Sequence, residues 1–127
     1  MRFAPISLVI RGKPTSKKTS ARQVFAKGRM IPIPSKDYVT YERSACLQLA
    51  VQYKAPPIED MCRVTAFFYR DNRTDVDNLI GGLLDILQKA GVIKNDRQVW
   101  GLEATKSGKC DGDPRVEVLI EPYEAAR

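Results

Sequence analysis

A strand pattern that runs almost directly into a helix pattern is the feature that most constrains the fold. Residues 61–70 are rich in Val, Phe, Thr and Tyr, which favour the pleated surface of a β-strand. In residues 77–90, leucines and isoleucines recur at helical spacing, and Gly91 follows at a position that commonly ends a helix. The turn between the two patterns carries Asp75 and Asp77, and Asp77 is well placed to cap the helix.

The flanking sequence predicts one more helix and several further strands. Ser35 is a suitable N-cap for a helix that stops before Pro56. The expected order is β-α-β-α-β-β, and the expected fold class is α+β, a single domain over residues 1–127 in which a mixed β-sheet packs with two helices. Strands are expected at residues 3–11, 61–70, 98–106 and 115–121, with a short extended segment or hairpin at 24–33.

Positive charge is concentrated in the first third of the chain. Residues 1–36 contain nine Lys or Arg and no acid, whereas the other 91 residues contain 12 basic and 15 acidic side chains. A cationic face of this kind commonly binds phosphate backbones, so the basic N-terminal segment 11–36 is predicted to contact nucleic acid. The alternative is a solvated surface that only keeps the protein in solution.

Several classes of site are excluded or disfavoured by composition. The chain has no histidine, and its three cysteines, Cys46, Cys62 and Cys110, are widely spaced. The common zinc sites and the Ser-His and Cys-His catalytic pairs are therefore excluded, and a disulfide framework is disfavoured. The thiols are expected to be reduced and partly buried. Catalysis would have to use carboxylates, lysines or metal-bound water, and no apolar run is long enough to predict a membrane span.

Asp75 and Asp77 are candidate metal ligands. Two carboxylates this close together repel each other unless a cation lies between them, and either an extended chain or a helix start would bring them together. Mg²⁺, or Mn²⁺ in its place, needs further oxygen ligands that a phosphate can supply. The alternative makes Asp75 a loop carboxylate and Asp77 only an N-cap. Asp111 and Asp113, on either side of a glycine, are interpreted as turn formers.

Five blocks of the sequence together resemble the RusA family of Holliday junction resolvases. The central block is the most specific, and it begins with an Asp-x-Asp-Asn-Leu helix start. The blocks are TDVDNL at residues 74–79, LLDIL at 83–87, GVIKNDRQV at 91–99, the basic GKPTSK at 12–17 and the strand PRVEV at 114–118.

The resemblance implies a metal-dependent hydrolase, an endonuclease that nicks four-way DNA junctions in DNA recombination and repair. It implies that Asp75, Asp77 and Asp96 are catalytic and bind Mg²⁺, with Mn²⁺ as an alternative, in a homodimer. A cytoplasmic, bacterial or prophage-encoded protein fits it. The alternative function is a non-catalytic accessory protein that binds branched DNA. The candidate DNA-binding residues are Arg11, Lys13, Lys17, Lys18, Arg22, Lys27, Arg29, Arg73 and Lys94.

Three positions carry expectations of their own. Better-known family members have a functionally important lysine four residues after the second Asp, where this chain has Gly81. Lys89, Lys94 or an N-terminal lysine could supply that charge instead. Phe25 and Trp100 are expected in the core, with a wedge at the DNA crossover as the alternative for either one.

The length of the predicted helix raises a question about Asp96. A helix over residues 77–90 is about 20 Å long, so Asp96 begins its turn at the far end from Asp75 and Asp77. A twofold dimer with antiparallel helices would bring Asp96 of one subunit to the other two aspartates of its partner. The small glycines at 81–82 would permit close contact between the two helices.

Overall fold

The computed structural model describes residues 3–15, 22–33, 35–70, 74–107 and 112–124. The fold class is α+β, as predicted, and the order of the main strands and helices matches the prediction. The segment expected to be extended or a hairpin at 24–33 is a hairpin. The elements are β1 (Ile6–Arg11), β2 (Arg22–Ala26), β3 (Arg29–Ile33), α1 (Lys36–Gln52), β4 (Cys62–Tyr69), α2 (Val76–Lys89), the 3₁₀ turn η1 (Asp96–Gln98), β5 (Val99–Ser107) and β6 (Arg115–Pro122).

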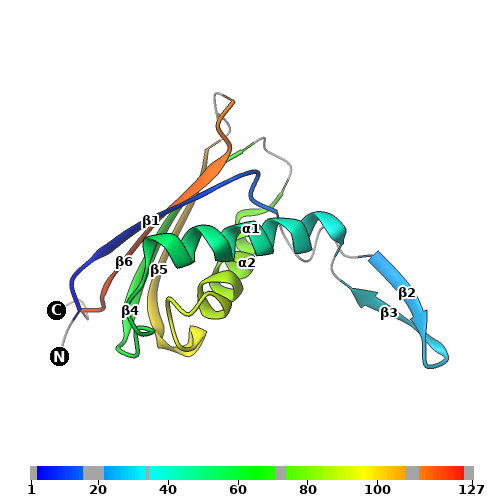
Figure 1. Ribbon diagram of the computed structural model, residues 1–127, viewed down its shortest axis with the longest axis horizontal. Coiled ribbons are helices and arrows are strands. Elements are labelled where there is room, and N and C mark those ends of the chain that lie inside the picture. The colour runs from blue at the N-terminus through cyan, green and yellow to red at the C-terminus, as the bar shows by residue number, and fades with distance from the viewer. Residues whose placement is uncertain (1–2, 16–21, 34, 71–73, 108–111, 125–127) are drawn as a thin grey trace.

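Four strands form a mixed sheet in the order β1-β6-β4-β5. The pairs β1–β6 and β4–β6 are antiparallel, whereas β4 and β5 are parallel. Because parallel neighbours need a crossover connection, α2 runs back along the sheet between them. Both helices lie on the same side of the sheet, as Figure 1 shows, and the hairpin of β2 and β3 projects away from it.

The core lies between the sheet and the two helices. Alternate residues of β4 point into it, so Phe68 is 1% exposed while its neighbour Phe67 is 41% exposed on the open face. The helix α2 contributes one apolar face, and Gly91 ends it with a positive φ of 75°. The buried residues of α2 are Leu79, Ile80, Gly82, Leu83, Ile86 and Leu87.

The helix α1 begins as predicted and also covers an edge of the sheet. The Ser35 hydroxyl accepts a hydrogen bond from the backbone N–H of Tyr38 at 3.2 Å. Two glutamines on the helix bond to the free edge of β1. Gln48 pairs with both backbone groups of Arg11 at 2.7 and 2.9 Å, and Gln52 pairs in the same way with Val9 at 2.9 and 2.7 Å. These amides hydrogen-bond with backbone groups of β1 that would otherwise be free to pair with a strand of another molecule.

Two sequence-based expectations about single residues were wrong. The N-cap of α2 is Asp75, and Asp77 lies inside the first turn, because the helix begins two residues earlier than a cap at Asp77 would allow. Phe25 and Trp100 are not core residues. Their exposed fractions are 69% and 63%, because Phe25 lies on the projecting hairpin and Trp100 lies on the edge strand β5 beside Tyr123.

The described cysteines are free thiols, one of them buried and the other half-buried. Cys62 is fully buried, and its burial raises the pKa of the thiol to about 11. Cys46 is half-buried, and burial also raises its pKa. Cys110 lies outside the described residues. No helix in the described part of the chain is long and apolar enough to cross a membrane.

The alternation along β4 predicts very different costs for two neighbouring substitutions. Phe68→Ala should lower the free energy of unfolding by about 3–5 kcal/mol, because it leaves a cavity in the core. Phe67→Ala, on the open face, should cost about 1 kcal/mol or less. Urea unfolding of both variants measures the difference, and equal costs would show that β4 does not present Phe68 to the core.

Candidate active site and DNA-binding surface

Asp75 and Asp77 both lie at the N-terminus of α2, with exposed side chains. Asp75 has extended backbone angles, and its carboxylate makes no capping hydrogen bond. The Asp77 carboxylate accepts one bond, from the backbone N–H of Asn78 at 2.9 Å. Neither aspartate forms an ion pair with another described residue. The positive end of the helix dipole favours negative charge at this position, so both carboxylates are available as ligands.

Asp96 lies at the other end of α2. Its backbone N–H donates to Oε1 of Gln88, in the last turn of the helix, at 3.0 Å. The 14 residues of α2 span about 20 Å. The three predicted aspartates are therefore not brought together within one subunit. Among the described residues, no three Asp, Glu or Cys side chains could hold one metal ion.

Gln98 organises the turn that carries Asp96. Its side-chain oxygen accepts bonds from the backbone N–H groups of Lys94 and Asn95 at 3.0 and 2.9 Å. Its side-chain nitrogen donates to the carbonyls of Ile58 and Asp60 at 2.7 and 2.9 Å. One amide thus ties the turn to the segment before β4. The sequence marked Gln98 only as part of the family motif, and it gave no role to Gln88 or Gln98.

The outer face of α2 connects the two ends of the site. Asp77, Gly81, Leu84 and Gln88 follow each other at intervals of four, three and four residues, which places them on one stripe of the helix. Asp77, Gly81 and Gln88 are exposed, and Leu84 is half-buried. A Cβ added at Gly81 would meet nothing within 4 Å. The centre of this stripe is therefore open to a neighbour.

Gly82, by contrast, faces the interior of the subunit. It is buried, and a Cβ there would contact the carbonyl oxygen of Thr15 at 3.6 Å and the ring of Tyr38 at 3.7 Å. The expectation that both glycines form one external contact patch is therefore wrong, because only Gly81 lies on the outer face.

A cationic cleft lies beside the N-terminus of α2. It has a volume of about 500 Å³ and reaches Thr74, the residue before Asp75. Arg70, at the end of β4, is buried, and its guanidinium donates to the carbonyl of Pro14. Sequence analysis did not select Arg70. The residues around the cleft include the cations Arg11, Lys13 and Arg70, the hydroxyls Thr15, Thr40, Ser44 and Thr74, and the acid Asp37.

Lys106 is a second residue that sequence analysis did not select. Its ammonium group, at the C-terminal end of β5, donates to the carbonyl of Thr74 at 3.0 Å. The parallel pairing of β4 with β5 puts this lysine next to the start of α2. A positive charge is therefore held one residue from Asp75, although position 81 is glycine.

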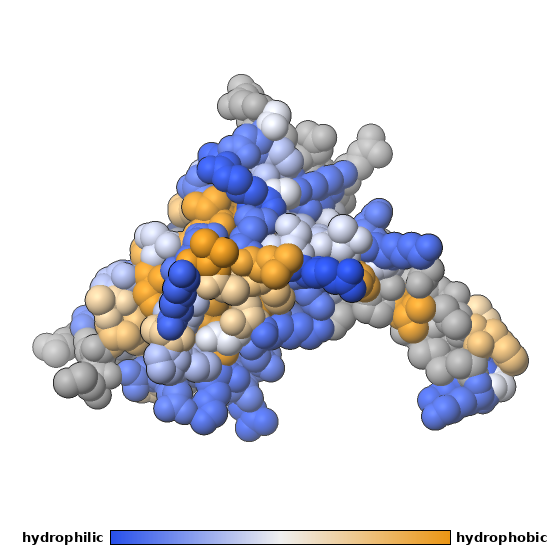
Figure 2. Space-filling view, viewed as in Figure 1, coloured by the Kyte–Doolittle hydropathy of each residue, from blue (hydrophilic) through white to orange (hydrophobic). Residues whose placement is uncertain are grey.

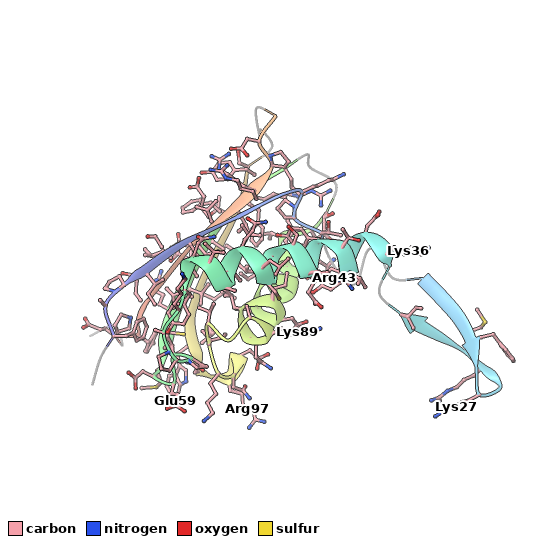
Figure 3. All side chains as sticks on the ribbon, in the orientation of Figure 1. Lys27, Lys36, Arg43, Glu59, Lys89 and Arg97 are labelled. Atoms are coloured by element: carbon pink, nitrogen blue, oxygen red, sulfur yellow. The ribbon has the colours of Figure 1, made fainter. Side chains whose placement is uncertain are left out.

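The predicted DNA-binding cations lie in three different settings. Lys13 lines the cleft, and Lys27 and Arg29 are exposed at the tip of the hairpin, where Figure 3 labels Lys27. Two others have carboxylate partners: Arg11 bonds Asp113 at 2.9 and 3.0 Å, and Lys94 bonds Glu59 at 2.7 Å. Arg22 begins β2. Lys17, Lys18, Arg73 and the predicted turn former Asp111 lie outside the described residues.

The family model described as endodeoxyribonuclease RusA matches residues 12–121 of this chain. The protein therefore belongs to the RusA family of endodeoxyribonucleases. It is similar to the crossover junction endodeoxyribonuclease RusA of Aquifex aeolicus (strain VF5), with 30% identity over 108 residues. That match covers 84% of each chain. The matched region of the family model includes both ends of α2, the turn with Asp96 and every residue around the cleft except Arg11.

The bonds of Gln98 predict that this residue positions Asp96. Gln98→Ala should leave the backbone N–H groups of Lys94 and Asn95 without their partner, which weakens the turn by about 2 kcal/mol. Amide hydrogen exchange at these two positions should then be about 30-fold faster. Arg97→Ala, in the same turn and exposed, is the matched control. Unchanged protection in the Gln98 variant would contradict the role.

Proposed function

We propose that the protein resolves Holliday junctions by paired, metal-dependent hydrolysis of phosphodiester bonds. The observation that carries this proposal is the family membership together with two unpaired carboxylates beside a cationic cleft. A polyanion drawn into the cleft would lie within reach of the end of α2. Arg11, Lys13 and the hydroxyl groups around the cleft would hold one DNA strand by its backbone, largely without reading bases.

Asp75 and Asp77 suit a hard divalent ion such as Mg²⁺, with Mn²⁺ as an alternative. They are exposed oxygen donors on one helix end, and one or two carboxylates per ion is the usual protein share of a magnesium site. Such an ion, when bound, supplies Lewis-acid polarisation of the phosphodiester and a water with a lowered pKa. The carboxylates would orient this water and leave room for phosphate oxygens.

Lys106 takes the place of the lysine that the resemblance leads one to expect at position 81. Of the alternatives suggested by sequence, Lys89 is paired with Glu42 at 2.9 Å and Lys94 with Glu59 at 2.7 Å. Lys106 instead reaches the residue before Asp75. Its positive charge would reduce the electrostatic repulsion between phosphate and carboxylate oxygens there.

A homodimer would complete the active site. Asp77 and Gln88 mark the two ends of the exposed stripe on α2, and Gly81 and Leu84 lie near its middle. If two such helices pack antiparallel about a twofold axis at Gly81, Asp96 of one subunit approaches Asp75 and Asp77 of the other. The dimer then has two equivalent sites, which suits a junction that must be nicked twice.

Asp75→Asn tests whether the protein is a nuclease. The variant should lose junction cleavage in Mg²⁺ by about a hundredfold or more, because one ligand of the ion is weakened. Junction binding, measured by gel shift in EDTA, should persist. Glu103→Gln, which changes an exposed carboxylate that pairs with Arg63 on the sheet, is the matched control and should cut normally. If the unaltered protein cuts no branched DNA, the accessory-protein alternative stands.

Mixing two inactive variants tests the shared site. In a dimer of Asp75→Asn with Asp96→Asn subunits, one site would have lost both aspartates and the other would retain both. Refolding the two variants together should therefore restore nicking of one junction strand per dimer. Asp75→Asn mixed with Asp77→Asn is the control. Both aspartates come from the same subunit, so each of the two sites in this mixed dimer has lost one aspartate. An inactive first mixture would show that each site lies within one subunit.

A further inference from the structure

The hairpin of β2 and β3 stands apart from the rest of the molecule. Figure 1 shows it extending beyond the N-terminus of α1, and among the described elements its strands make extended contact only with each other. An isolated two-stranded hairpin is at best marginally stable in water. A segment of this kind is expected to act by binding to something else.

Two large apolar side chains are exposed side by side near the tip. Phe25 and Met30 are directly paired across the two strands, so they lie on the same face of the hairpin. They are 69% and 56% exposed. Figure 2 shows hydrophobic surface on this arm next to hydrophilic surface. An exposed apolar pair at the end of a projecting arm favours insertion into a partner over packing within the subunit.

The charge of the arm indicates what kind of partner it meets. Residues 22–33 contain three cations and no acid. The turn itself carries Lys27, whose φ of 53° lies in the left-handed region that asparagine and glycine usually occupy, and Gly28 follows with a φ of 77°. A lysine at the tip and Arg29 beside it therefore flank the apolar pair. This combination fits a polyanion better than a second copy of the chain.

We propose that the β2–β3 hairpin is a DNA wedge. Phe25 and Met30 would insert between base pairs next to the branch point, and Lys27 and Arg29 would contact the flanking phosphates. Phe and Met are among the side chains that partially unstack base steps in this way, and a two-stranded ribbon fits a DNA groove. Unstacking costs least where pairing is already disturbed, as at a branch point. The inference rests on the proposed junction-binding function.

The test uses inactive Asp75→Asn protein and a four-way junction that carries 2-aminopurine beside the branch point. Binding should raise the fluorescence of this base, because it becomes unstacked. Phe25→Ala/Met30→Ala in the same protein should abolish the rise and weaken junction affinity about tenfold. The matched control is Phe67→Ala/Met61→Ala, which removes an exposed Phe from β4 and an exposed Met just before it (41% and 48% exposed) and should change neither quantity.

A charge variant gives an independent measurement. Lys27→Gln/Arg29→Gln should lower junction affinity and reduce the slope of log affinity against log salt by nearly two, because two phosphate contacts are lost. An unchanged slope would overturn the phosphate contacts of the wedge. Because all four hairpin residues are exposed, unfolding temperatures should match the parent protein, and that match keeps a loss of binding interpretable.

Other outcomes separate this inference from the proposed function. A full fluorescence rise with Phe25→Ala/Met30→Ala would overturn the wedge, even if the unaltered protein cuts junctions. A fall in the molar mass of that variant without DNA, measured by light scattering, would also overturn it, because the arm would then dock on a second copy. If the unaltered protein distorts junctions but never cuts them, the nuclease function fails and the wedge stands. Absence of junction binding would overturn both.

Discussion

The parallel pairing of β4 with β5 is the constraint on which the rest of the structure depends. Two parallel neighbours cannot be joined by a tight turn, so the chain must return along the sheet before β5 begins. The helix α2 makes that return and buries its apolar face on the way. Its two ends therefore lie at opposite ends of the sheet, which separates Asp75 and Asp77 from Asp96. The same pairing carries Lys106 back to the start of the helix.

This separation gives the family resemblance a physical consequence. A metal site that needs all three aspartates cannot form within the described part of one chain, yet every one of the three is exposed and unpaired there. If the exposed stripes of two α2 helices pair antiparallel in a dimer, the N-terminal end of one helix lies beside the C-terminal end of the other. Gly81 would then be used for close approach between helices, with charge supplied from β5. The glycine at position 81, where a lysine is expected, and the sharing of each active site between two subunits would then both follow from the close packing of the two helices.

Glutamine side chains hold the parts around the site in place. Gln48 and Gln52 fasten α1 to the edge of β1, and both elements contribute residues to the cationic cleft, such as Ser44 from α1 and Arg11 from β1. Gln88 and Gln98 fix the turn that carries Asp96. A neutral amide can donate and accept at once, so it satisfies backbone groups without placing a competing charge near the carboxylates. Asp75, Asp77 and Asp96 thus form no ion pair with another described residue.

The sequence by itself determined the fold class, the two helices and most of the strands, because hydrophobic spacing, Ser35 and Gly91 are local signals. It also supplied the motif that identifies the family. The sequence also predicted that Asp96 lies a helix length from Asp75 and Asp77, because the helix comes between them in the chain. Tertiary structure alone decided that Phe25 and Trp100 are exposed, and that Arg70 and Lys106 flank the start of α2. These depend on which strands pair and which edges stay open. Such long-range contacts leave no periodic trace in the chain.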